Sequence, residues 1–317
     1  MTNTLELEVK NNILKTAVKW LFLIGTSSFL AYKLISYDSY SAFFNSFNNL
    51  TSNHIFAFLT AITLLPLNIY IEAQKWRLLV SKTVLLTTHQ AIKAVLAGFS
   101  TGFFSPNRIG EMAGRMLFVK PEHRKIIAFY ALLNGFTQNL IIAIVGLPAA
   151  LHFFGSNYAS FPIHSQTYLS ILGIFLIIAI LFFLLMPKIA TNKVFQNRIP
   201  FLSDLKLFKT SDLLKIGLYT LTRFCVFSVQ MYLILLFFRV DIRIIEALIS
   251  IPASYLFITL IPTVAFSEAG VRSSVAVFFV GAFCSNSAGI ALAGLLLWLL
   301  NFGLPMLVGL KIIAYTK

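Results

Sequence analysis

Two short segments of this chain place a glutamate four residues before an arginine, close to a proline and a glycine. The pairs are Glu111 with Arg115 and Glu268 with Arg272, and both lie in apolar surroundings. A charged side chain inside a membrane costs about 2.5–3.5 kcal/mol even on lenient insertion scales. We therefore expect these four residues to have either a functional or a structural role. One hypothesis is that the arginines bind an anionic head group while the glutamates gate its passage or carry protons. The alternative is that each pair is an i,i+4 ion pair that only stabilises its own segment.

Each segment also contains the signals that end one helix and begin another. We call residues 105–115 the first tip and residues 261–272 the second tip. Each has a proline that stops the incoming helix, and Asn107 and Ser267 are good N-caps for the outgoing helix. A helix N-terminus exposes N–H groups and a partial positive charge, which suits an anion. We therefore predict an anion-binding site made by Asn107, Arg108, Glu111, Arg115, Ser267, Glu268 and Arg272.

Other polar residues in the predicted spans are weaker candidates. Two roles fit Arg223, which either lines the site or extends its charge to the membrane surface. Asn134 and Gln138 lie one helical turn apart and either face a polar cavity or bond neighbouring helices. Glu72 and Lys75 fall at the predicted end of a span, where we expect interfacial anchors. The histidines and cysteines show no ligand spacing, so we predict no catalytic constellation, no metal site and no cofactor.

The composition determines which elements hold these residues. Of 317 residues, 58% are hydrophobic and 11% charged, whereas about a quarter of a soluble domain is charged. Apolar runs of the ~20 residues that a bilayer core requires recur along the chain. We therefore predict an all-α integral membrane protein with a single transmembrane domain over residues 1–317. Six full spans are expected at 17–35, 55–72, 126–151, 167–187, 216–238 and 289–310.

The distribution of Lys and Arg orients these spans. Basic residues gather in segment 1–16, after the second and fourth spans and at the C-terminus, whereas 36–54 and 152–166 carry none. The positive-inside rule then predicts a multi-pass protein of the cell inner (plasma) membrane with both termini and segment 1–16 in the cytoplasm. The same rule accounts for 25 basic against 11 acidic residues, so nucleic acid is not expected as a partner.

Two further apolar segments, 91–120 and 246–284, do not fit as simple spans. If the first crossed the membrane, the basic residues that follow it would lie outside, against the positive-inside rule. We therefore predict two re-entrant helical hairpins that enter from opposite faces. Similar tips in opposite orientations indicate an inverted repeat with halves 55–187 and 216–314, and such paired interruptions mark binding sites in transporters.

The tips also resemble the two motifs of the lysylphosphatidylglycerol synthase transmembrane, or flippase-like, family. The first motif is Pro106 followed by Gly110 and Glu111, and the second is Pro262 followed by Gly270-Val271-Arg272. The chain departs from many relatives in the second motif, because a serine rather than a glutamate follows the arginine. The resemblance implies movement or presentation of a phospholipid or a polyprenyl-phosphate-linked lipid.

The leading hypothesis is therefore a non-enzymatic flippase-like transporter whose partners are membrane lipids with an anionic or lipid-phosphate head group. One alternative is a membrane-embedded enzyme that uses Glu111 as a base. The other is a non-catalytic scaffold whose partner is a membrane or cytoplasmic lipid-modifying enzyme. The sequence contains nothing similar to a nucleotide-binding loop, so transport is expected to use an ion gradient or to be passive.

Overall fold

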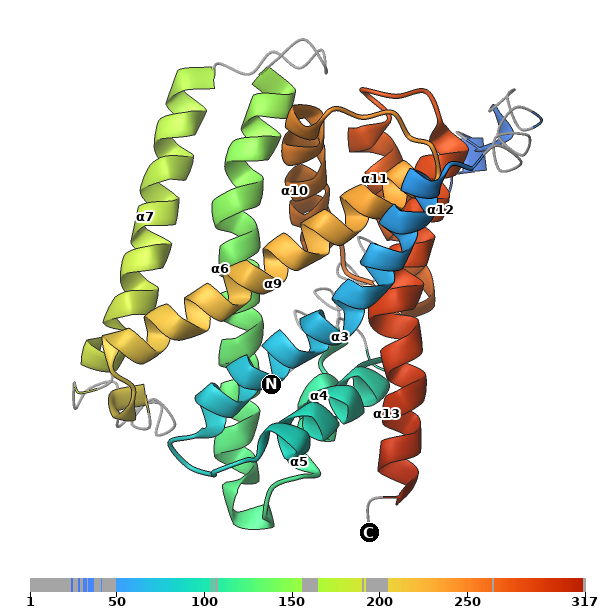
Figure 1. Cartoon of the computed structure of the whole chain (residues 1–317). Coiled ribbons are helices and arrows are strands. Elements are labelled where there is room, and N and C mark those ends of the chain that lie inside the picture. Colours follow the sequence, from blue (N-terminus) through green and yellow to red (C-terminus); the bar gives the residue numbers. More distant parts are fainter. Residues whose placement is uncertain are drawn as a thin grey trace, which may run out of the picture.

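The computed structural model describes residues 50–103, 105, 108–155, 165–189, 191, 205–263 and 265–315, with scattered positions between 24 and 41. Every regular element in this part of the chain is helical (Figure 1). The elements are α3 (Ser52–Val80), α4 (Thr88–Phe103), α5 (Glu111–Met116), η2 (Pro121–His123), α6 (Arg124–Gly155), α7 (Ser165–Ile189), α9 (Thr210–Phe237), α10 (Ile244–Leu260), α11 (Ala265–Val280), α12 (Ser287–Trp298), η4 (Leu299–Gly303) and α13 (Leu304–Tyr315).

Five helical stretches are long and apolar enough to cross a membrane. They are Ser52–Val80, Pro121–Gly155, Ile171–Ile189, Thr210–Phe237 and Ser287–Tyr315. They confirm five of the six predicted spans and make the chain a multi-pass membrane protein. The sixth prediction, 17–35, falls mostly outside the described residues, and segment 1–16 falls wholly outside them. The predicted end of the second span was wrong, because α3 continues for two further turns beyond Glu72.

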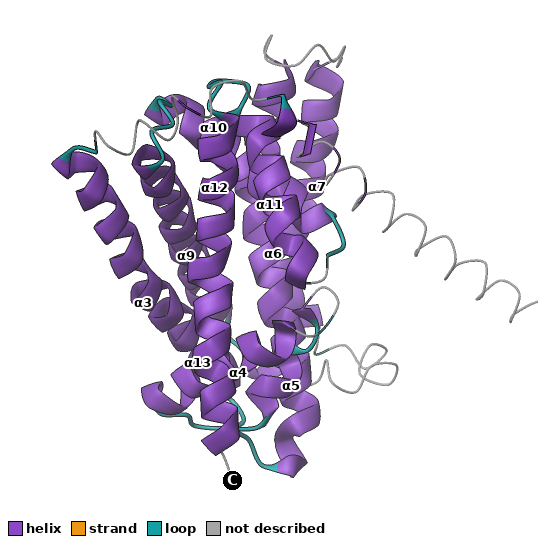
Figure 2. Ribbon diagram, turned by 90° about the vertical axis from the view of Figure 1, so that its right-hand side faces the viewer, coloured by secondary structure: helices purple, strands orange, loops and turns teal. Residues whose placement is uncertain are grey.

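The remaining long segments form two pairs of shorter helices. At 1.5 Å per residue, α4, α10 and α11 are each about 24–26 Å long and α5 is about 9 Å, all short of the ~30 Å bilayer core. Both views place α4 and α5 at the end of the molecule where the chain terminates, and α10 and α11 at the opposite end (Figures 1 and 2).

Buried apolar side chains anchor each pair of short helices separately. Trp76 and Val95 belong to a cluster that joins α3 to α4, and Val277 and Ile290 belong to another that joins α11 to α12. The long helices run between these two ends, and α3 packs along α9. The loops between the paired helices are thereby directed toward the middle of the molecule.

Small residues allow the first pair to pack closely. A Cβ on Gly114 of α5 would lie 2.3 Å from the carbonyl oxygen of Ala97 on α4. The Thr101 hydroxyl donates to the Gly110 carbonyl at 2.6 Å and accepts from the Gly114 amide at 3.0 Å. Small residues of this kind let membrane helices approach closely, and side-chain hydroxyls bond across the contact. Together they hold α5 in place although it has only six residues.

Candidate functional site

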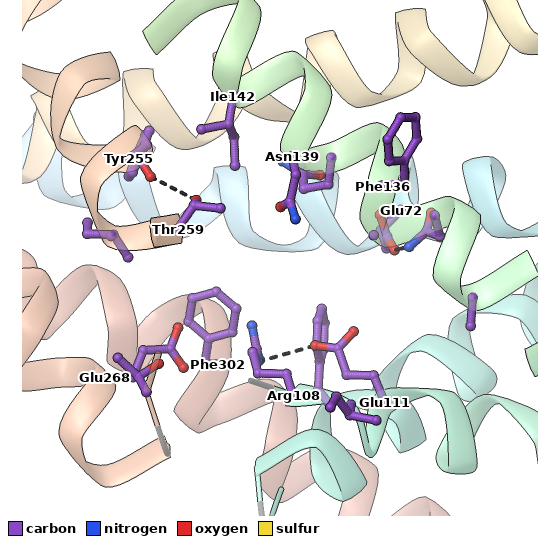
Figure 3. A pocket seen from close by; sticks show the side chains of 18 of the residues that line it. Glu72, Arg108, Glu111, Phe136, Asn139, Ile142, Tyr255, Thr259, Glu268 and Phe302 are labelled. Atoms are coloured by element: carbon purple, nitrogen blue, oxygen red, sulfur yellow. Dashed lines mark hydrogen bonds and ion pairs between the residues drawn. The ribbon is translucent and has the colours of Figure 1, made fainter. Parts of the chain in front are cut away.

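A cavity of about 580 Å³ lies between the two tips, and we call it the central cavity. Its wall comes from both pairs of short helices, from α3, α6 and α9, and from η4. Figure 3 shows residues of the first tip and of α11 facing α10 and α6 across it. The charged residues among the described part of the lining are Glu72, Arg108, Glu111, Arg115, Arg223, Glu268 and Arg272. Four arginines against three glutamates leave this wall with one formal positive charge.

The first tip contributes a glutamate held between two arginines. Oε1 of Glu111 lies 3.3 Å from Nε of Arg108, and Oε2 of Glu111 lies 3.3 Å from Nη2 of Arg115. Arg108 has a backbone φ of 59°, a left-handed conformation that is uncommon for residues other than glycine. The chain therefore holds this arginine in an unfavourable local conformation beside the cavity.

The second tip repeats the ion pair. Oε1 of Glu268 accepts from Nε and Nη2 of Arg272 at 3.0 and 2.8 Å. Both i,i+4 pairs proposed from the sequence therefore form, as the structural alternative requires. The two pairs differ in burial, because Arg115 is 3% exposed whereas Arg272 is 14% exposed.

The predicted N-caps do not hold. α11 begins at Ala265, so Ser267 lies inside its first turn rather than at the N-cap. Asn107 lies outside the described residues, and α5 begins only at Glu111 with Gly110 at the N-cap position. A six-residue helix gathers little dipole, so the positive charge of the first tip comes from its arginines rather than from a helix N-terminus.

The largest difference between the sequence-based predictions and the structure concerns Glu72. It is not an interfacial anchor but is 1% exposed, lines the cavity and faces several cations. Oε1 accepts from Nη2 of Arg115 and from Nδ2 of Asn134, both at 2.8 Å. Oε2 lies 3.0 Å from Nζ of Lys75, itself fully buried, and 3.2 Å from Nη1 of Arg223. One carboxylate thus joins α3, α5, α6 and α9.

Arg223 occupies, of the two positions considered for it, the one at the cavity. It is buried, lines the cavity, and donates from Nε to Oδ1 of Asn68 at 2.8 Å. Its Nη1 donates to Oε1 of Gln138 at 3.2 Å. Asn134 and Gln138 therefore fulfil both suggestions made for them, since they bond neighbouring helices and also line the cavity.

Aromatic rings support all four cavity arginines, a feature that the sequence analysis missed. The guanidinium carbon of Arg108 lies 3.8 Å from the centroid of the Phe302 ring, and that of Arg272 lies 4.7 Å from the same ring. Arg115 lies over Trp76 at 4.7 Å and Arg223 over Phe227 at 5.2 Å. Such contacts stabilise a cation that has left water.

The charges of the cavity wall favour an anion as the ligand. Within the part of the chain that the structure describes, no group of three or more His, Cys, Asp or Glu side chains could hold a metal ion. Among the same residues, Nη1 of Arg115 and Oδ1 of Asn134 are buried without a hydrogen-bond partner. Both atoms are covered by protein, so they belong to the buried network around Glu72 rather than to the cavity surface.

Fold and cavity together define a multi-pass helical membrane protein with an internal, charged cavity. The chain belongs to the family described as "Lysylphosphatidylglycerol synthase TM region", whose model matches residues 22–309. The family suggested by the two tip motifs is thereby confirmed. The comparisons with curated proteins and with solved structures gave no match.

Proposed function

We propose that this protein binds the anionic head group of a membrane lipid in the central cavity and moves the lipid between leaflets. The main observation in support is that arginines from both tips line one cavity whose wall is otherwise largely apolar. A lipid phosphate is a good ligand for such groups, because guanidinium–phosphate hydrogen bonds are charge-assisted and frequently bidentate. The apolar part of the wall suits the glycerol and acyl portion of the same molecule.

The proposal includes the two re-entrant hairpins and the inverted repeat. In support, α4–α5 and α10–α11 lie at opposite ends, and each pair consists of helices too short to cross the bilayer alone (Figures 1 and 2). Irregular backbone is tolerated at membrane depth only when it is buried in protein or lines a wet cavity. The loops of both pairs meet this condition at the central cavity. Rocking of one half against the other would then expose the site to alternate sides.

The proposed orientation places the α4–α5 end in the cytoplasm of a cell inner membrane. The connections at this end and the start of α9 carry several basic residues, namely Lys82, Lys120, Arg124, Lys125, Lys209 and Lys215. At the opposite end Arg239 and Arg243 are the exceptions, and Arg243 is paired with Glu246. The positive-inside rule favours this orientation, with the C-terminus in the cytoplasm.

In the proposed mechanism the head group competes with the protein's own carboxylates. Glu111 and Glu268 occupy the guanidinium edges of Arg108 and Arg272. An incoming phosphate takes these edges and displaces the carboxylates, which keeps the cations neutralised before and after binding. The exchange keeps both arginines paired in a low-dielectric site, where an unpaired charge is the main cost. The displaced Glu111 retains Arg115 as its partner, whereas Glu268 turns to the water of the cavity.

Reconstitution into liposomes tests this function directly. Purified protein should accelerate the movement of labelled anionic phospholipid, or of labelled polyprenyl phosphate, between leaflets relative to empty liposomes. Arg272→Gln should reduce that rate by at least tenfold, while Lys93→Gln, which is not part of the cavity lining, should not. Equal rates with and without the protein would refute transport. A modified lipid recovered by mass spectrometry would instead favour the enzyme alternative.

A further inference from the structure

One phenylalanine ring is shared by the two tips, and the guanidinium carbon of Arg108 also lies 5.6 Å from the centroid of the Phe99 ring. Phe302 is 6% exposed, and both Arg108 of the first tip and Arg272 of the second tip approach its ring. Figure 3 shows the ring between Glu268 and Arg108. Two guanidinium groups repel each other, and a ring whose face is electron-rich can hold both. The two carboxylates that pair with these arginines, Glu111 and Glu268, offset their charge from the outer sides.

The backbone around this ring is irregular in two independent places. Phe302 belongs to η4 (Leu299–Gly303), a π-helical turn between α12 and α13. Such turns are rare in proteins, and those that occur are frequently found at functional sites. The neighbouring Asn301 is bonded to Asn68 at 2.7 Å and to Gln230 at 2.8 Å, which fixes the turn against α3 and α9. The second irregular place is Arg108, which contacts the Phe302 ring and has a left-handed φ.

We propose that Phe302 is a positioning residue that presents Arg108 and Arg272 together to one phosphate group of the ligand. This inference rests on the proposed function of the central cavity. A guanidinium that stacks on a ring uses its flat face and keeps the N–H groups along its edge for planar, bidentate hydrogen bonds. The fixed ring therefore sets the spacing of two donor edges, one from each tip. The ligand class is a phosphate-bearing lipid head group that both tips contact at once.

The test compares variants that keep or lose the ring. Phe302→Leu retains an apolar side chain but removes the π-face, whereas Phe302→Tyr keeps the ring. Binding of phosphatidylglycerol is measured by native mass spectrometry from mixed micelles, with phosphatidylcholine as the comparison lipid. We expect Phe302→Leu to weaken phosphatidylglycerol binding roughly tenfold, as the loss of two partly desolvated cation–π contacts would produce. Phe302→Tyr should stay within about threefold of the original chain, and phosphatidylcholine binding should change little.

A matched control separates ring chemistry from packing. Phe279 is 1% exposed and lies in a separate cluster with Phe153 and Phe257. Phe279→Leu therefore replaces a buried phenylalanine by leucine, as Phe302→Leu does, but away from the arginines. It should lower thermal stability without changing lipid selectivity. If Phe302→Leu does not fold, trifluorinated phenylalanine at position 302 keeps the shape, weakens the π-face and should still reduce affinity.

The outcomes distinguish this inference from the function on which it rests. If the original chain binds neither phosphatidylglycerol nor phosphatidylcholine above background, the proposed function falls and the inference with it. If the original chain binds phosphatidylglycerol and the Leu and fluorinated variants bind it equally well, only the positioning role of Phe302 is overturned. Equal weakening by the Leu and Tyr variants would likewise assign the effect to packing and overturn that role.

Discussion

The carboxylate of Glu72 and the guanidinium of Arg115 are joined at 2.8 Å although 43 residues separate them in the sequence. Arg115 also pairs with Glu111 at 3.3 Å, so this one guanidinium links the body of α3 to the first tip. Two further cations, Lys75 and Arg223, lie at the other oxygen of Glu72. The position of the first tip therefore depends on a carboxylate outside it.

Glu72→Gln should be among the most destabilising single substitutions in the described chain. The change leaves three buried cations around a neutral group, and removal of one partner of a buried ion pair typically costs 3–5 kcal/mol. We expect a clear fall in the midpoint of thermal unfolding in detergent. Glu122→Gln is the matched control, because Glu122 is exposed and, within the described residues, forms an ion pair with the partly exposed His123, and exposed pairs contribute about 0–1 kcal/mol. Equal midpoints for the two variants would show that the Glu72 network does not stabilise the fold.

Glu111→Gln and Glu268→Gln should differ in transport. Glu111 lies between two arginines, whereas the ion pair that the structure describes for Glu268 is with Arg272. If transport is proton-coupled, Glu111→Gln should abolish gradient-driven accumulation in proteoliposomes and leave exchange largely intact, because glutamine keeps the shape and loses the titration. Glu268→Gln should cause a smaller loss. A Glu111→Gln protein that moves lipid at the original rate over the full pH range would exclude the coupling role.

Gly114 should tolerate no side chain, because its Cβ would lie 2.3 Å from the Ala97 carbonyl oxygen. Gly114→Ala is expected to destabilise the protein by about 1–3 kcal/mol, the usual cost of overpacking. Gly217→Ala is the control, since no atom lies within 4 Å of its Cβ position and alanine favours a helix by about 1 kcal/mol. Thermal unfolding of both variants measures the difference. The close contact of α4 and α5 would be refuted by a Gly114→Ala protein as stable as the original.

The sequence was sufficient for the parts of the fold that depend on local pattern. Apolar length predicted the spans, and the spacing of Glu111 and Arg115 and of Glu268 and Arg272 predicted two ion pairs that form. The four-residue separation places such side chains on one face of a helix. It could not reveal that both pairs line one cavity, which depends on how distant helices pack.

Glu72 and Phe302 were missed for different reasons. Asn68, Glu72 and Lys75 recur at spacings of four and three, which places them on one face of α3. Because the predicted span ended at Glu72, Lys75 fell outside the helix and the shared face was not recognised. A helix extended by one turn would have included all three residues. Phe302 gave no such signal, because the chain has 32 phenylalanines and a π-helical turn has no simple sequence signature. Its role is evident only from the two arginines that approach it.

The orientation of the two hairpins can be tested by cysteine labelling in cells. With Cys225 and Cys284 replaced by serine, a single cysteine is introduced at either Glu122 or Ser285, both of which are exposed. Glu122 lies in η2, after α5, and Ser285 lies between α11 and α12. The α10–α11 pair is at the opposite end of the molecule from α4 and α5 (Figure 1). The positive-inside rule predicts that an impermeant thiol reagent added outside labels Ser285→Cys but labels Glu122→Cys only after the membrane is opened. Outside labelling at both positions would mean that the first pair of short helices crosses the membrane, and the opposed hairpins and the inverted repeat would both be refuted. Outside labelling at position 122 alone would instead reverse the proposed orientation of the whole chain. Labelling at neither position until the membrane is opened would refute the placement of the second pair alone. The expected pattern, with each position reached from its own side, would place the two pairs of short helices at opposite faces of the membrane, as the proposed inverted repeat requires.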